Sequence, residues 1–193
     1  MIELYAVTRA QDAPLPGTLR ALPAGGLAAV VGPVDEADDE EVTTAEALWR
    51  HEELVESLMA DRDVLPVRYG TRFKRDEEAA QAVAARRATL TAALDHVRGA
   101  VELSVRAASP EPIASPAARD RARRSIHDAL RALARDATER LAQPPSELLR
   151  AAYLVDRDAV DDFVAHVTQL QAARPDLRIL CTGPWPPYSF SEA

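Results

Sequence analysis

Apolar and polar positions alternate in residues 2–6, and a short apolar run at 27–31 ends at Gly32 and Pro33. Alternation with a period of two is typical of strands, because successive side chains of a strand point to opposite faces. We therefore predict a strand in each run. The Pro- and Gly-rich stretch between them is predicted to be a loop.

Helical spacing follows in the next part of the chain. Apolar residues recur every three or four positions from Ala47 to Met59, and Thr43 and Glu46 have the spacing of a capping box. This pattern predicts an amphipathic helix that begins near residue 43. A second helix is predicted from Asp76 to just before Gly99, where a glycine suits a helix end.

Two further apolar runs predict strands. Residues 64–67 contain a proline, which indicates an edge strand or a bulge, and residues 101–105 alternate apolar and polar side chains. The predicted order of elements is then β-β-α-β-α-β. Such an order indicates an α+β fold, here an N-terminal ferredoxin-like sheet with helices packed on one face.

Three prolines in residues 109–116 interrupt any regular element, so we place a domain boundary there. The prediction is a ferredoxin-like N-terminal domain, residues 1–108, and a smaller C-terminal α+β domain, residues 109–193. The second domain is predicted to contain a long charged helix with its apolar stripe from Ile126 to Leu141, a strand, a helix and a last strand. Two strands are marginal alone, so this unit should pack on the first domain or recruit the tail.

The tail, residues 183–193, contains three prolines and three aromatic residues. Proline removes backbone donors, so the tail is predicted to be extended. Its aromatic side chains are costly to leave in water. We predict that the tail docks over the groove between the domains, and donation of the tail to another protein is the alternative. The predicted docking residues are Trp185, Pro186, Pro187, Tyr188 and Phe190.

Charge and hydropathy narrow the class of protein. The formal net charge of −8 argues against binding to nucleic acid, which requires a basic surface. The acidic run at 35–41 is predicted to be a solvated loop. The sequence shows neither a secretory leader nor a long apolar window, so we predict a cytoplasmic protein that binds no lipid membrane. The single cysteine, Cys181, is predicted to be a buried thiol.

Motifs for catalysis are missing from the sequence. His51 and Glu52 lack the second histidine of a zinc protease motif, because position 55 is Val55. His51 is therefore predicted to be a core or capping residue. Phosphate-binding glycine loops and a nucleophile elbow do not occur either. We predict no enzyme activity, no cofactor and no metal.

One short segment, the arginine-tyrosine turn of residues 68–75, combines planar cations with aromatic side chains. Three interpretations stay open: an anion or substrate pocket, salt bridges to nearby carboxylates, or a protein interface, in which arginine and tyrosine are enriched. The candidate partner-binding residues are Arg68, Tyr69, Arg72, Phe73 and Arg75.

Four ordered segments resemble a known family. Residues 51–55 and 64–73 in the N-terminal half, and residues 150–157 and 176–190 in the C-terminal half, are similar to the recurrent stretches of the GvpL/GvpF family of gas vesicle accessory proteins. The short Ser/Pro run near 107–119 departs from the longer segment expected there. Membership of the F-like or L-like branch stays open.

The resemblance implies a two-domain α+β layout and a role in assembling the gas-filled protein shell. It implies binding to the very hydrophobic shell subunit, protection of that subunit from aggregation, and support of vesicle nucleation or growth. The implied partners are the gas vesicle shell protein and other gas vesicle accessory proteins, and the implied locations are the cytoplasm and the gas vesicle. The alternative is a ferredoxin-like enzyme or small-molecule sensor that uses Arg68, Tyr69 and His51 in the cleft between the domains.

Overall fold

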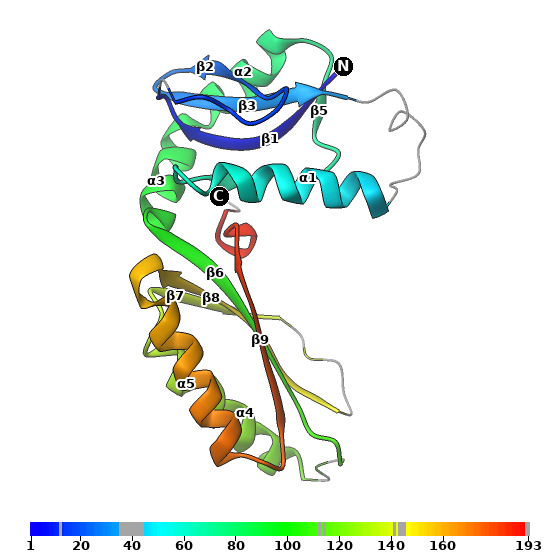
Figure 1. Cartoon of the computed structure of the whole chain (residues 1–193), viewed down its shortest axis with the longest axis vertical. Coiled ribbons are helices and arrows are strands. Elements are labelled where there is room, and N and C mark those ends of the chain that lie inside the picture. Colours follow the sequence, from blue (N-terminus) through cyan, green and yellow to red (C-terminus); the bar gives the residue numbers. More distant parts are fainter. Residues whose placement is uncertain are drawn as a thin grey trace. The chain divides into compact units, whose positions relative to one another are not determined.

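The computed structural model describes residues 1–11, 13–34, 45–111, 113, 115–140, 142 and 146–191. The chain forms two compact units. Unit 1 consists of Met1–Arg98 together with Pro186–Ala193, and unit 2 is Gly99–Trp185. Figure 1 shows the elements of each unit. The chain therefore leaves unit 1 after Arg98 and returns to it at Pro186.

Unit 1 contains an antiparallel sheet with the strand order β2-β3-β1-β4, and β5 also pairs with β1. Nearly all of β1 and β3 is buried, which indicates that both faces of this sheet are covered. The strands are β1 (Ile2–Arg9), β2 (Arg20–Ala24), β3 (Leu27–Pro33), β4 (Leu65–Pro66) and β5 (Arg72–Phe73).

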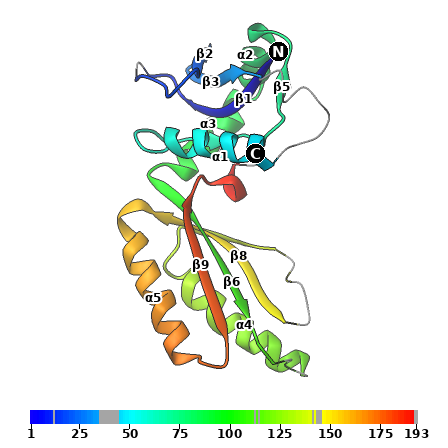
Figure 2. The same cartoon turned by 45° about the vertical axis from the view of Figure 1, so that its right-hand side comes forward.

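Three helices pack on this sheet, with α1 and α2 on opposite sides (Figures 1 and 2). They are α1 (Ala45–Leu58), α2 (Asp76–Ala85) and α3 (Arg87–Val97). The single helix predicted from Asp76 is therefore two helices, which meet at Arg86. The predicted capping residue Thr43 and the acidic run at 35–41 lie outside the described residues.

Unit 2 has the element order β-α-β-β-α-β and the antiparallel strand order β7-β8-β6-β9. This is the ferredoxin-like order, so the sequence analysis assigned that fold to the wrong half of the chain. The α+β class itself is confirmed. The elements are β6 (Ala100–Ala108), α4 (Pro116–Arg131), β7 (Asp136–Glu139), β8 (Glu147–Asp156), α5 (Val160–Ala173) and β9 (Arg178–Trp185), with short 3-10 turns at Arg157–Ala159 and, in unit 1, Tyr188–Phe190.

Strand β6 explains why the domain boundary differs from the prediction. The boundary was placed after residue 108, but residues 100–108 pair along their length with β8 and β9. Unit 2 also gains β7, because α4 ends at Arg131 and Ala137 lies in a strand opposite Tyr153. The end of the predicted helical stripe, Leu141, lies outside the described residues. With four strands, unit 2 is not the marginal two-stranded unit that the pattern predicted.

The core of unit 2 lies between one face of the sheet and the two helices, α4 and α5 (Figure 2). Helix α4 buries Ala122, Ile126 and Leu130, which recur at helical spacing. Ser115 caps this helix by accepting a hydrogen bond from the Ala118 N–H at 3.4 Å, and Pro116 follows at the first helical position.

Edge strand β9 contains a bulge at Gly183 and Pro184. Trp185 pairs with Glu102 and Thr182 pairs with Ser104, so two residues of β9 lie opposite one residue of β6. Gly183 has φ +120°, and a Cβ atom there would lie 2.7 Å from the carbonyl oxygen of Glu102. Only glycine fits this position without a shift of the backbone.

We expect Gly183→Ala to lower the free energy of unfolding of unit 2 by about 3 kcal/mol, because the clash adds to the backbone strain. Gly99→Ala is the matched control: its φ is +66°, but no atom lies within 4 Å of the added Cβ. Its cost should be about 1 kcal/mol. Urea unfolding followed by Trp185 fluorescence, with Trp49 replaced by Phe in both variants, measures the difference, and equal losses would contradict the bulge.

Candidate functional site

The arginine-tyrosine turn connects two short strands that pair with the same neighbour. β4 pairs with the middle of β1, and β5 pairs with its start. Gly70 allows the chain to turn between them with φ +83°. The carbonyl of Thr71 accepts a hydrogen bond from the N–H of Leu4 at 2.9 Å, and the Thr71 hydroxyl donates to the Arg68 carbonyl at 2.9 Å. The turn is thus fixed to the edge of the sheet.

A buried histidine and a buried carboxylate lie beneath the turn. His51 of α1 and Glu3 of β1 have side chains only 2% and 3% exposed, and His51 Nδ1 lies 2.8 Å from Glu3 Oε1. His51 Nε2 lies 2.8 Å from the Val67 carbonyl oxygen, which accepts only, so Nε2 carries a proton. The N–H of Gly70 donates to Glu3 Oε1 at 3.0 Å. This pair therefore joins α1, β1 and the turn.

Two tyrosines enclose the imidazole of His51. The ring of Tyr5 stacks on it with centroids 4.7 Å apart and an interplanar angle of 18°, and the ring of Tyr69 meets it edge-on at 5.6 Å. The predicted burial of His51 in the core is confirmed, and its ring contacts the backbone of Val67 rather than capping a helix. Neither ring nitrogen of His51 faces solvent, so this histidine has a structural role. The ring of Tyr69 is held in place by packing against it.

The predicted arginines of the turn lie in different surroundings. Arg68 is exposed, whereas Arg72 and Phe73 are partly buried in β5. Arg75 is 70% exposed and forms an ion pair with Glu78 at 2.9 Å, and that contact holds the pKa of the Glu78 carboxyl below its usual range. The salt-bridge interpretation thus applies to Arg75, while Arg68 and Phe73 line a common cavity.

This cavity has a volume of about 480 Å³ and lies within unit 1. Its walls are mainly apolar, and two arginines contribute to its lining. The bulge at Tyr5 shifts the pairing of β1, so that Leu4 and Val7 both contribute. The lining residues are Leu4, Val7, Leu65, Pro66, Val67, Arg68, Thr71, Phe73, Ala82, Val83, Arg86, Leu90, Tyr188 and Ser191.

The helical wall of this cavity and the contribution of the tail were not predicted from the sequence. Ala82 and Leu90 come from α2 and α3, and Tyr188 comes from the far end of the chain. A pattern of apolar residues at helical spacing in 76–97 was visible in the sequence. It predicted burial, but it contained no signal that the turn and the tail would meet the same helices.

The predicted docking residues of the tail are divided between the two units. Trp185 is the last residue of β9 in unit 2, is 39% exposed, and its Nε1–H donates to the Thr182 hydroxyl at 3.3 Å. Pro186 and Pro187 are buried, and Tyr188 and Phe190 are partly buried within unit 1. The ring of Phe190 lies 6.5 Å from that of His96.

Burial affects the chemistry of Tyr188. It raises the pKa of the Tyr188 phenol above its ordinary value, and the carboxylates of Glu52, Glu56 and Glu3 raise it further. The phenol is therefore neutral at physiological pH. Tyr188 therefore adds no negative charge to the lining of the cavity.

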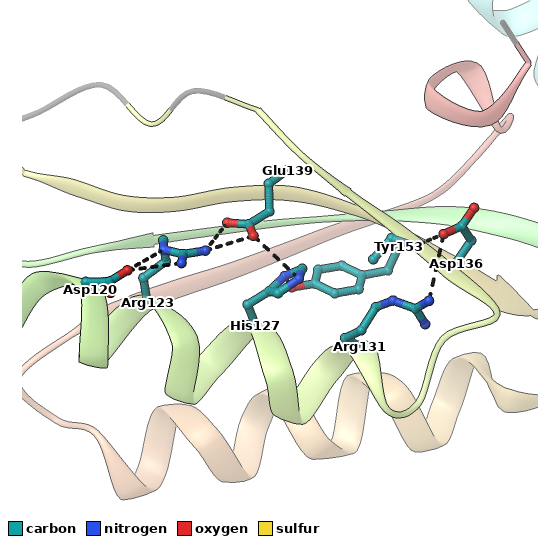
Figure 3. A network of polar contacts seen from close by, with 8 residues as sticks. Asp120, Arg123, His127, Arg131, Asp136, Glu139 and Tyr153 are labelled. Carbon is teal, nitrogen blue, oxygen red and sulfur yellow. Dashed lines mark hydrogen bonds and ion pairs between the residues drawn. The ribbon is translucent and has the colours of Figure 1, made fainter.

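A second polar cluster lies between α4 and β7 in unit 2 (Figure 3). Arg123 binds Asp120 at 3.0 Å and Glu139 at 2.6 Å. Burial raises the pKa of the Tyr153 phenol, so its hydroxyl keeps its proton, and this hydroxyl is hydrogen-bonded to His127 Nδ1 at 3.0 Å. His127 Nε2 then lies 3.5 Å from Glu139 Oε1. Each of these groups has a partner, and together they fasten β7 to α4.

Among the described residues, no three His, Cys, Asp or Glu side chains gather closely enough to hold a metal ion. None of the helices in the described part of the chain is both long enough and apolar enough to span a membrane.

Comparison with known proteins identifies similar chains. The family model described as gas vesicle synthesis protein GvpL/GvpF matches residues 4–118 and 114–192. Gas vesicle protein F2 of Halobacterium salinarum is 31% identical over 171 residues, which are 86% of this chain and 76% of the relative. Gas vesicle protein F of Haloferax mediterranei is 30% identical over 170 residues, which are 86% of this chain and 78% of the relative.

Solved structures show the same fold. The crystal structure of the gas vesicle protein GvpF from Anabaena sp. PCC7120 has a TM-score of 0.86 at 17% identity, covering 100% of this chain and 96% of that one. The GvpF structure from Microcystis aeruginosa has a TM-score of 0.79 at 15% identity, covering 100% and 99%.

Because His51 and Glu3 form a buried pair, we predict that His51→Leu strongly destabilises unit 1. The change leaves the Glu3 carboxylate buried without its nearest partner, so we expect the free energy of unfolding of unit 1 to fall by about 3–5 kcal/mol. Adding Glu3→Gln should recover part of this loss, because a neutral amide still accepts from Gly70. Urea unfolding followed by Trp49 fluorescence, with Trp185 replaced by Phe, measures both variants. A loss near 1 kcal/mol for His51→Leu alone would contradict the pair.

We predict that removal of the tail lowers the stability of unit 1 only. Removing residues 186–193 should expose the apolar walls that Tyr188 and the buried prolines cover, so amide hydrogen exchange in β1 and β4 should accelerate while β6 and β8 stay protected. The control is Trp185→Ala, which alters the end of β9 and should leave exchange in β1 unchanged. Faster exchange in unit 2 after truncation would contradict this assignment of the tail.

Proposed function

We propose that this chain, which belongs to the gas vesicle synthesis protein GvpL/GvpF family, binds the hydrophobic subunit of the gas vesicle shell. The family is involved in gas vesicle formation, and its model matches residues in both units. In our proposal the chain limits aggregation of the shell subunit and supports nucleation or growth of the vesicle. Its locations are then the cytoplasm and the vesicle, where it stays as a minor component.

The proposed partner is a small, very hydrophobic subunit. A very hydrophobic small protein aggregates until its apolar face is buried. A chain with net charge −8 keeps a complex dispersed by repulsion between complexes. A binding partner for such a subunit therefore needs an apolar site on a highly charged body.

The cavity of unit 1 is the observation that supports this proposal best. It has apolar walls, a volume of about 480 Å³, and Arg68 and Phe73 of the arginine-tyrosine turn in its lining. Trp49 adds an apolar side chain, 69% exposed, on α1 of the same unit. We propose that an apolar segment of the shell subunit enters the cavity and that the turn contacts the rest of that subunit.

The remaining parts of the proposal concern partners and chemistry. We propose that other gas vesicle accessory proteins bind this chain as well, and that nucleic acid and lipid bilayers do not. An enzyme or small-molecule sensor is the less favoured function, since both nitrogens of His51 already face protein oxygens. We propose a role without catalysis and without a cofactor.

Blocking the cavity should abolish binding. Ala82 lines the cavity on α2, whereas Ala84, on the same helix, is exposed and outside the lining. We expect Ala82→Trp to reduce capture of the co-expressed shell subunit about tenfold or more, and Ala84→Trp to leave capture unchanged. Affinity capture from co-expressing cells, with the melting temperature of each variant measured alongside, provides the test.

A second pair of variants tests the turn. Arg68→Glu should weaken capture, and Arg87→Glu, an exposed arginine of α3 that does not line the cavity, is its control for charge. If the wild-type chain neither captures the shell subunit nor increases its soluble fraction, the binding proposal is wrong. If Ala82→Trp captures as well as Ala84→Trp does, binding occurs elsewhere on the chain.

A further inference from the structure

In the described part of unit 2, no helix lies on one face of the sheet (Figures 1 and 2). α4 and α5 lie on the same side of the sheet (Figures 1 and 2). Val105, Ala151 and Cys181 form a cross-strand row that packs against those helices. Because neighbouring side chains of a strand point to opposite faces, the next row, Arg150, Arg106 and Leu180, lies on the helix-free face.

Arginines from three strands, and one from the residue that follows the fourth strand, lie on this face. The N–H of Arg140, the residue after β7, donates to the Arg150 carbonyl at 2.8 Å, so Arg140 extends the row. On β9, Arg178 lies two residues before Leu180, and both are exposed. We name this surface the arginine face; it consists of Arg106, Arg140, Arg150 and Arg178.

The arginine face is electrostatically unusual in an acidic chain. Arg106 and Arg150 lie directly opposite each other on adjacent strands, an arrangement that repels unless an anion compensates for it. Arg150 has an ion pair with Glu147 at 3.1 Å. On the helix-covered side, Asp120 of α4 and Glu139 of β7 both bind Arg123 (Figure 3).

The side chains of the neighbouring row on this face are small. The adjacent cross-strand row consists of Thr138, Ala152, Ser104 and Thr182. Sheet faces that bind single-stranded nucleic acid instead present aromatic side chains for base stacking, and neither of these two rows contains one.

We propose that the arginine face binds an acidic, extended segment of a partner protein. A guanidinium can bind a carboxylate through two parallel hydrogen bonds, and at Arg150 the segment would compete with Glu147. Four strands separated by about 4.8 Å span about 14 Å, which matches an extended segment of about five residues. Leu180, 58% exposed beside Arg106, adds an apolar contact. This surface belongs to unit 2 and is independent of the shell-binding proposal for unit 1.

A peptide of eight glutamates with a fluorescent label is the probe, and the full chain is the protein. We expect binding that weakens as salt is added, because the contact is charge-assisted. Arg106→Glu should weaken binding about tenfold or more. Arg121→Glu, an equal change of charge at an exposed position of α4, should alter binding less than twofold. Fluorescence anisotropy measures the dissociation constants.

If Arg106→Glu does not fold, nuclear magnetic resonance of the wild-type chain with the peptide can test the same surface. The peptide should then shift amide signals in β6, β8 and β9 and leave those of α4 unchanged. Absence of binding to the wild-type chain, or equal losses for Arg106→Glu and Arg121→Glu, would overturn the proposal. Tighter binding of an eight-nucleotide thymidine oligomer would instead indicate that the partner is a nucleic acid. Self-association of the wild-type chain that Arg106→Glu abolishes would indicate that the partner is a second copy of this chain.

Discussion

A carboxylate buried in the first strand sets the structure of unit 1. Glu3 is 3% exposed, and a charged group at that depth is costly unless it is paired and hydrogen-bonded. His51 of α1 and the N–H of Gly70 supply those contacts. A helix, a strand and the arginine-tyrosine turn therefore have to be in place together, because displacing any one of them leaves a buried polar group unsatisfied.

The position of the turn then determines the cavity. With residues 67–71 held against β1, Arg68 and Phe73 face the helices α2 and α3 across an apolar space. The tail completes the lining from the other end of the sequence, through Tyr188 and Ser191. The proposed binding site thus combines parts of the chain that are distant in sequence, and its shape depends on the buried pair beneath the turn.

Local patterns in the sequence predicted many of the helices and strands, but they did not predict which elements pair or pack with one another. Alternation predicted β1, a short apolar run predicted β3, and helical spacing predicted α1 and α5. Strand β7 has four residues with a single apolar side chain, Ala137, so its pattern carries almost no signal. The domain boundary was misplaced because the pairing of β6 depends on β8 and β9, which follow much later in the chain. The cavity was missed for the same reason, whereas the pairing of Arg75 with Glu78 is local and was foreseeable.

Hydrogen exchange of the full chain, measured with and without the co-expressed shell subunit, tests the central claim most directly. The account predicts slower exchange in β4, in the arginine-tyrosine turn and in α2 when the shell subunit is bound, with β6 and β8 of unit 2 unchanged. Protection confined to unit 2, or no protection anywhere in a complex that does form, would contradict the claim that the cavity of unit 1 receives the shell subunit.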